Sequence, residues 1–78
     1  MEYNIIYLTS KVILSKKQFE SWNDIQELYE DYKASLKFET IEEVNDFLSS
    51  EYRIDEESTK KMTKNIYQEE SIELIFLT

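Results

Sequence analysis

The pattern of apolar and polar residues predicts strands at both ends of the chain and helices between them. Residues 2–8 are β-branched and aromatic, and residues 12–14 resume the apolar run after a polar turn. These two segments predict a β-hairpin, whose second strand we expect at an edge of the sheet because lysines follow it. Residues 71–78 predict another strand, apolar on both faces after Glu73, which we place beside the first strand.

A ten-residue pattern occurs twice in the middle of the chain, at residues 19–28 and 38–47. Each copy reads phenylalanine, glutamate, a hydroxyl residue, an apolar residue, a polar residue, an acid, an apolar residue, an amide, an acid and an apolar residue. The hydroxyl residues, Ser21 and Thr40, are suited to capping the first turn of a helix. An acid follows each of them three positions later, as in a capping box, and Glu43 fits that position better than an aspartate does. Both copies therefore predict the start of a helix.

We predict three helices, at residues 22–34, 41–50 and 56–66, with Asp55 as the N-cap of the third. The side chains expected to face the core from the first helix are Trp22, Ile25, Tyr29, Tyr32 and Leu36. Those expected from the second are Ile41, Val44, Phe47 and Leu48, and those from the third are Ile54, Met62 and Ile66. The fold class is α+β, a small β-β-α-α-α-β domain with the helices packed on one face of a mainly antiparallel sheet.

Composition limits the chemistry that this chain can perform. Its 78 residues suffice for one domain, residues 1–78, and it contains no His, Cys, Gly or Pro. Without His or Cys it lacks the commonest acid–base and nucleophilic groups, so we expect no enzyme, no catalytic residues, no cofactor and no metal site. Without Gly there is no phosphate-binding loop, and any turn that needs a positive φ must use another residue, such as Asn65.

The net charge is −8 and is concentrated in one part of the sequence. Residues 1–17 carry a net charge of +2, residues 18–57 a net charge of −10, and residues 58–78 none. Direct binding to nucleic acid is disfavoured by this charge, because contacts with phosphates need a positive surface. A helix-turn-helix over residues 38–65, with Lys60, Lys61 and Lys64 on its second helix, is a weaker alternative whose connector is longer than usual.

The acids of the two repeats are predicted to form a stripe on each helix, away from the apolar stripe. Since aligned like charges repel one another, four carboxylates on one line favour a surface kept for a positively charged partner over a coat for solubility. The candidate partner-binding residues are Glu20, Asp24, Glu27, Asp31, Glu39, Glu42, Glu43 and Asp46.

In size and charge the chain resembles the small acidic inhibitors of phages and mobile elements, namely anti-CRISPR proteins, anti-restriction DNA mimics and nuclease-immunity proteins. This resemblance implies an inhibitor that occupies the basic nucleic-acid groove of a host protein in the bacterial cytoplasm. Residues 1–3 do not resemble a signal peptide, and no apolar run is long enough to cross a membrane. The alternative is a small adaptor or structural module, including a homodimer, that uses exposed aromatic residues and an open sheet edge.

Overall fold

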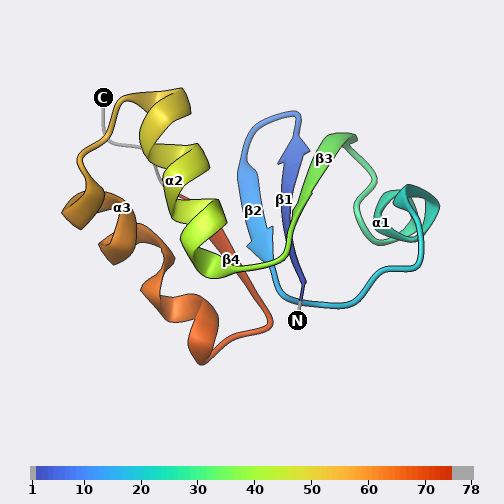
Figure 1. The fold of residues 1–78 in the computed structure, drawn as a ribbon. Helices are drawn as coiled ribbons and strands as arrows, with labels where there is room; N and C mark the ends of the chain where they lie inside the picture. Colours follow the sequence, from blue (N-terminus) through green and yellow to red (C-terminus); the bar gives the residue numbers. More distant parts are fainter. Residues whose placement is uncertain (1, 75–78) are drawn as a thin grey trace.

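A computed structural model describes residues 2–74 and shows a four-stranded antiparallel sheet between two layers of helices (Figure 1). The longest element is α2, and the sheet separates it from α1. The elements in chain order are β1 (Tyr3–Leu8), β2 (Val12–Ser15), α1 (Trp22–Leu28), β3 (Tyr32–Phe38), α2 (Ile41–Tyr52), α3 (Glu56–Thr63), the 3-10 helix η1 (Lys64–Tyr67) and β4 (Ser71–Leu74).

The α+β class and the antiparallel sheet are confirmed, but the predicted order of elements lacked one strand. The first helix ends at Leu28 instead of residue 34, and residues 32–38 form β3. In this segment Tyr32 and Leu36 are four residues apart, which suits a helical stripe. They also belong to a strict alternation of apolar and polar residues from Tyr32 to Phe38, which is typical of a strand. The order is therefore β-β-α-β-α-α-β.

The strands lie in the order β3-β1-β2-β4, so the two strands of the N-terminal hairpin form the centre of the sheet. The prediction that the second strand lies at an edge is wrong, because β2 pairs with β1 on one side and with β4 on the other. The last strand was expected beside β1 but pairs with β2, with Leu74 opposite Val12. The rest of the predicted strand, residues 75–78, lies outside the described residues.

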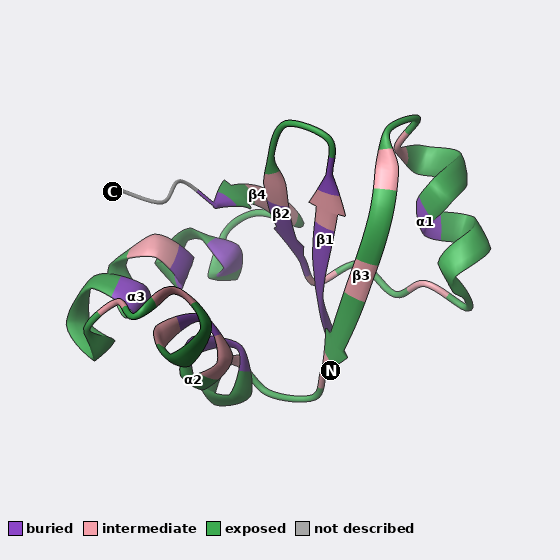
Figure 2. Ribbon diagram, turned by 90° about the horizontal axis from the view of Figure 1, so that it is seen from above, coloured by how far each residue is buried: buried purple, intermediate pink, exposed green. Residues whose placement is uncertain are grey.

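Each face of the sheet supports its own core, because successive side chains of a strand point to opposite faces. On one face, Ile5 of β1 packs with Leu14 of β2 and with Val44 and Leu48 of α2. On the other face, a smaller cluster combines Ile6, Leu8 and Ile13 with Ile25 of α1. Figure 2 shows these buried positions along β1 and β2, with the helices on either side. The prediction that all helices pack on one face is therefore wrong.

Only one residue of α1 is buried, so most of its predicted apolar stripe is not core. Ile25 is buried, Tyr29 is half-buried, and Trp22 is 58% exposed. Tyr32 and Leu36 belong to β3, where Leu36 is exposed and Tyr32 packs against the smaller cluster. The stripe predicted for α2 is confirmed, since Val44 and Leu48 are fully buried while Ile41 and Phe47 pack at their border.

The N-terminal cap predicted for α2 is confirmed, and the helix ends in a left-handed residue. The Thr40 hydroxyl accepts a hydrogen bond from the backbone N–H of Glu43 at 3.1 Å, and a carboxylate oxygen of Glu43 accepts one from the N–H of Thr40 at 3.2 Å. At the other end, Arg53 has φ 55° and is the only described residue with a positive φ. The expectation that Asn65 takes this conformation is wrong, because Asn65 lies within η1.

Helices α2 and α3 are joined by two polar contacts that the sequence pattern did not indicate. The hydroxyl of Thr63 donates a hydrogen bond to Oδ1 of Asn45 at 2.7 Å, and the hydroxyls of Ser49 and Thr59 lie 2.8 Å apart. Thr59 and Thr63 are both buried, one helical turn apart on α3. In addition to the few apolar residues predicted to face the core from this helix, two threonines are therefore buried. Their hydroxyls form hydrogen bonds with side chains of α2.

Candidate functional site

The four acids predicted to form a stripe on the first helix do not lie along one helix. Asp24 and Glu27 belong to α1, whereas Glu20 precedes the helix and Asp31 lies in the turn before β3. All four side chains are exposed. They form what we call the α1 acidic patch, defined by Glu20, Asp24, Glu27 and Asp31. The prediction of a stripe of four aligned carboxylates on a longer helix is corrected, because the helix ends at Leu28.

Two of these four carboxylates also stabilise the local backbone. A carboxylate oxygen of Asp24 accepts a hydrogen bond from the N–H of Glu20 at 3.1 Å, while Ser21, the predicted cap, makes no side-chain cap bond. Asp31 accepts a hydrogen bond from the N–H of Thr9 at 3.3 Å and so ties the turn before β3 to the β1–β2 hairpin. Substitution of either aspartate would therefore disturb the fold as well as the charge.

The four acids of the second repeat gather at the N-terminal half of α2. Glu39 precedes the helix, Glu42 and Glu43 lie in its first turn, and Asp46 follows. All are exposed, and together they form the α2 acidic patch, defined by Glu39, Glu42, Glu43 and Asp46. Their position near the positive end of the helix dipole is favourable for negative charge. Only Glu43 has a structural role in addition, in the capping box.

The fold places the two patches in different layers, since α1 and α2 pack on opposite faces of the sheet (Figure 1). The prediction brought them together as two neighbouring helices. In the structure they instead occupy two sides of a body that measures 33 × 26 × 20 Å. A partner that contacts both patches must therefore surround the protein from two directions.

The lysines of this protein leave both patches unneutralised. Three ion pairs occur among residues 2–74: Lys37 with Glu2 at 2.9 Å, Lys60 with Glu56 at 3.6 Å and Lys61 with Glu57 at 3.8 Å. None of them includes an acid of either patch. Five patch carboxylates have neither an ion pair nor a hydrogen bond within the described residues. These five are Glu20, Glu27, Glu39, Glu42 and Asp46.

The helix-turn-helix alternative gains a suitable connector, but two of its three lysines are paired with glutamates. Because α2 extends to Tyr52, only residues 53–55 separate it from α3. However, Lys60 and Lys61 each pair with a glutamate one turn earlier on the same helix. This arrangement reduces the positive potential that α3 could offer to phosphates. The carboxylate of Asp55 caps α3 as predicted, and its hydrogen bonds to Ser58 lower its pKa below the ordinary value.

Two tyrosines on the face that α2 covers have raised pKa values. Burial is the main cause for Tyr7, and a side-chain hydrogen bond with Tyr52 adds to the increase in its pKa. Burial also raises the pKa of Tyr3, with smaller contributions from Tyr67 and from the negative charge of Glu42. Both hydroxyls therefore stay protonated near neutral pH, Tyr3 within the main cluster and Tyr7 at its border.

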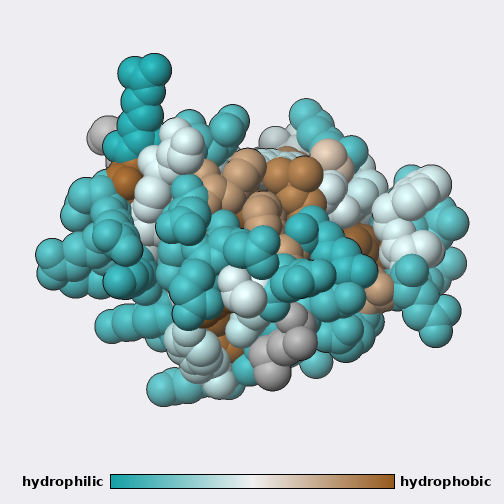
Figure 3. Space-filling view, viewed as in Figure 1, coloured by the Kyte–Doolittle hydropathy of each residue, from teal (hydrophilic) through white to brown (hydrophobic). Residues whose placement is uncertain are grey.

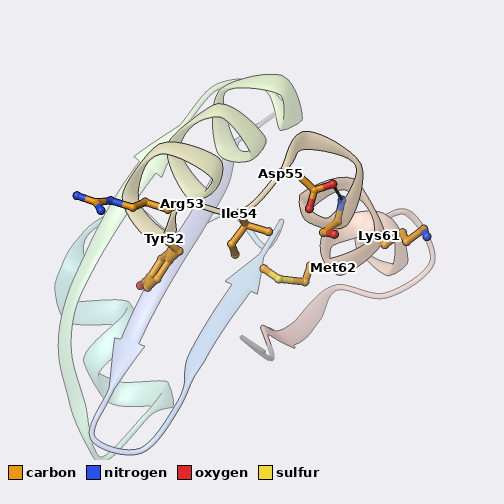
Figure 4. Close-up of a pocket in the computed structure, with 7 residues that line it drawn as sticks. Tyr52, Arg53, Ile54, Asp55, Lys61 and Met62 are labelled. Carbon is orange, nitrogen blue, oxygen red and sulfur yellow. Dashed lines mark hydrogen bonds between the residues drawn. The ribbon is translucent and has the colours of Figure 1, made fainter. Parts of the chain in front are cut away.

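Two open pockets lie on the described part of the chain. The larger, of about 530 Å³, lies where α2 leads into α3 and is lined by Tyr52, Ile54 and Met62 among others. Figure 4 shows Ile54 and Met62 pointing toward one another, whereas Arg53 and Lys61 extend away from the pocket. A second pocket, of about 440 Å³, lies beside the turn of the β1–β2 hairpin.

Among residues 2–74, no group of three or more acidic side chains is arranged to hold a metal ion. No helix within this range has the length and apolar character that a bilayer span requires.

Sequence reasoning missed a set of large apolar side chains that remain exposed. Figure 3 shows a mainly hydrophilic surface with a small apolar area over the strands beside α2. The helical repeat gives no signal for the exposure of Trp22 and Leu28, since both flank Ile25 on α1 and the repeat therefore places them toward the core. Within residues 2–74, the exposed large apolar residues are Trp22, Leu28, Leu36 and Tyr67.

No protein family, curated protein or solved structure matches this chain.

Proposed function

We propose that this protein is a non-enzymatic inhibitor that binds the basic nucleic-acid groove of a host defence or nucleic-acid-processing protein. The observation that carries the proposal is the exposure of eight acids in two patches, none of them paired with a lysine or arginine of residues 2–74. A chain that needed only a soluble surface could balance these acids with the lysines that it already has. The unpaired carboxylates are instead available to the cations of a partner.

The placement of the patches supports a cleft over a flat surface as the binding site. The patches lie on opposite sides of the sheet, and the shorter dimensions of the molecule are 26 and 20 Å. A nucleic-acid duplex likewise carries phosphates on both sides of its axis, and a protein that encloses it has cationic side chains on two walls. Each wall would face one acidic patch, in the manner of a DNA mimic. Long-range attraction between such surfaces speeds association and is weakened by salt.

Two charge-reversal variants test whether the acidic patches bind a partner, and both change only acids that have no structural role. The first variant is Glu20→Lys/Glu27→Lys in the α1 acidic patch, and the second is Glu39→Lys/Glu42→Lys/Asp46→Lys in the α2 acidic patch. These side chains have no hydrogen bond or ion pair within residues 2–74, so the fold is expected to be retained. A matched control, Glu69→Lys/Glu70→Lys, makes the same charge change as the first variant at exposed positions outside both patches.

The tagged protein is used to capture partners from bacterial lysate, with elution by a salt gradient and identification by mass spectrometry. We expect one nucleic-acid-binding protein, released at moderate salt, displaced by duplex DNA and lost from both patch variants but retained by the control. Capture that resists salt, or that all three variants retain equally, would refute the proposal.

A second candidate function is an adaptor module with an ordinary protein interface, including a homodimer. It is favoured by the four large apolar side chains that are exposed in the described part of the chain and by the position of β3 at an edge of the sheet. One observation argues against strand pairing at this edge. Lys33 and Lys37 lie on β3, and lysines on an edge strand oppose the addition of another strand. Sedimentation at low and high salt distinguishes this candidate, because self-association that is insensitive to salt would support the adaptor function and argue against the inhibitor.

A further inference from the structure

Residues 19–37, which we call the α1–β3 arm, lie outside the larger core cluster of the protein. The arm contains α1 and all of β3 except Phe38, and the chain enters it after β2 and leaves it just before α2. Figure 1 shows α1 and β3 together at one end of the molecule, with α2 and α3 at the other. The buried residues of the larger cluster all lie outside the arm; they are Tyr3, Ile5, Leu14, Val44, Leu48, Ile66 and Leu74.

Little buried surface holds the arm in place. Ile25 is the one buried residue of the arm, and it packs against apolar side chains of β1 and β2. Strand β3 lies at an edge of the sheet and contains no buried residue, although it pairs with β1 along its length. Because the local stability of a segment follows its buried apolar contacts, the arm should open at a lower free energy than the rest of the protein.

The side-chain contacts that tie the arm to β1 and its hairpin lie at exposed positions. The N–H of Thr9 donates a hydrogen bond to the carboxylate of Asp31 at 3.3 Å, and both residues are exposed. Lys37 pairs with Glu2 at 2.9 Å, and the lysine side chain is 61% exposed. Exposed polar contacts of this kind contribute little to stability, because water replaces the lost partner. The arm is therefore held mainly by the β1–β3 pairing and by Ile25.

Both ends of the arm are attached to structure that does not depend on it. Before the arm, Ser15 is fully buried, and its hydroxyl accepts a hydrogen bond from the hydroxyl of Ser71 at 2.9 Å. After the arm, Phe38 packs against Phe47 with ring centroids 5.3 Å apart, and the cap at Thr40 begins α2. These contacts keep β2 and α2 in place when the residues between them leave the sheet.

We infer that the α1–β3 arm opens and closes as one unit while the rest of the protein stays folded. Opening breaks the β1–β3 pairing and exposes Ile6 and Leu8, but it leaves the larger core cluster intact. All four acids of the α1 acidic patch lie on the arm, and all four of the α2 acidic patch lie outside it. The arm is thus a conformational device that changes the separation of the two charged surfaces, whatever partner these surfaces bind.

Amide hydrogen exchange of the complete protein, measured for each residue by NMR at several low urea concentrations, tests this inference. The chain contains no proline, so every residue of the arm has a backbone amide proton. We expect the hydrogen-bonded amides of α1 and β3 to share one opening constant and one urea dependence. They should exchange at least about 100-fold faster than the interior amides of α2, with a smaller urea slope because less surface is exposed.

Two isoleucine variants form a matched pair. Ile25→Val changes the arm, and Ile66→Val makes the same change at a fully buried position of the larger core cluster. Ile25→Val should raise the exchange rates of α1 and β3 by the same factor, about fivefold. Ile66→Val should leave them unchanged, because Ile66 stays buried whether the arm is open or closed. The amides of α2 should exchange about fivefold faster in both variants, because complete unfolding exposes both isoleucines.

Three results would overturn the inference. Equal opening constants for the arm and for α2 would show that the arm opens only when the whole protein unfolds. The same conclusion would follow if Ile66→Val accelerated the exchange of the arm as much as that of α2. Different responses of α1 and β3 to Ile25→Val would show that these two elements do not open together.

Discussion

Thr63→Val tests the polar contact between α2 and α3, because valine keeps the shape of threonine and removes its hydroxyl. Thr63 is 2% exposed, and its hydroxyl donates to Oδ1 of Asn45 at 2.7 Å. The same hydroxyl lies 3.3 Å from the carbonyl oxygen of Thr59, which remains bonded to its helix after the substitution. The principal loss therefore falls on Asn45, whose side chain is buried beside it.

The expected cost follows from the burial of the acceptor. A hydrogen bond contributes about 0.5–1.5 kcal/mol, and a buried group left without its partner costs about 1–3 kcal/mol. We therefore expect Thr63→Val to lower the free energy of unfolding by about 2 kcal/mol. A domain of this length has a total stability of roughly 4–12 kcal/mol, so the loss is a large fraction. The melting temperature should fall by about 10 °C.

Urea unfolding followed by far-ultraviolet circular dichroism measures this difference, and an unchanged slope shows that the same surface is exposed on unfolding. Thr63→Ser is the matched control, since it keeps the hydroxyl and loses only a methyl group, at about 1 kcal/mol. The double variant Asn45→Leu/Thr63→Val removes both polar partners and should be more stable than the sum of its single changes predicts. A cost below about 0.5 kcal/mol for Thr63→Val, or strict additivity in the double variant, would refute the reasoning.

Three other predictions concern the left-handed cap, the half-buried Tyr7 and the packing of α1. Arg53→Gly should raise the free energy of unfolding by about 0.5–1 kcal/mol, because glycine adopts φ 55° without a steric cost; a lower urea midpoint would contradict this. The raised pKa of Tyr7 means that its contribution to stability is complete below its ordinary pKa of 10.0 and is lost as the pH rises above it. Melting temperatures should therefore fall more steeply between about pH 10 and 12 in the natural protein than in Tyr7→Phe, and parallel curves would show that Tyr7 is not responsible. Ile25→Ala should cost about 2–4 kcal/mol, whereas Trp22→Ala should change stability by less than about 0.5 kcal/mol, as measured by urea unfolding; equal losses would mean that the indole also belongs to the core.

The parts of the fold that the sequence predicted correctly depend on local signals. Thr40 and Glu43 form a capping box because their spacing alone brings each side chain to the other's backbone N–H. The N-cap role of Asp55 and the buried stripe of α2 likewise need only neighbours in the sequence and a helical repeat. The hairpin of β1 and β2 also has its two strands close together in the chain.

The parts that sequence analysis missed depend on contacts between distant segments. Residues 32–38 fit both a helical and a strand repeat, and the choice is made by pairing with β1, where Leu36 lies opposite Ile5. The side of the sheet that α1 covers could not be predicted either, because Ile6 and Ile5 are both fully buried and both faces of β1 are apolar. For the candidate site, exposure of the eight acids was predictable from their chemistry, but their division between two layers required the path of the chain.

The strand order also determines when during folding the sheet can be completed. The β1–β2 hairpin closes over a short turn, whereas the contact of Ser15 with Ser71 joins residues 56 positions apart. Closing a long loop costs more entropy and slows folding, so β4 should join after the hairpin has formed. During synthesis β2 therefore presents an unpaired edge until Leu74 has been added. In that interval the nascent chain depends on its charge to avoid association with other chains. The acids that we assign to partner binding would then also protect the protein while it is being made.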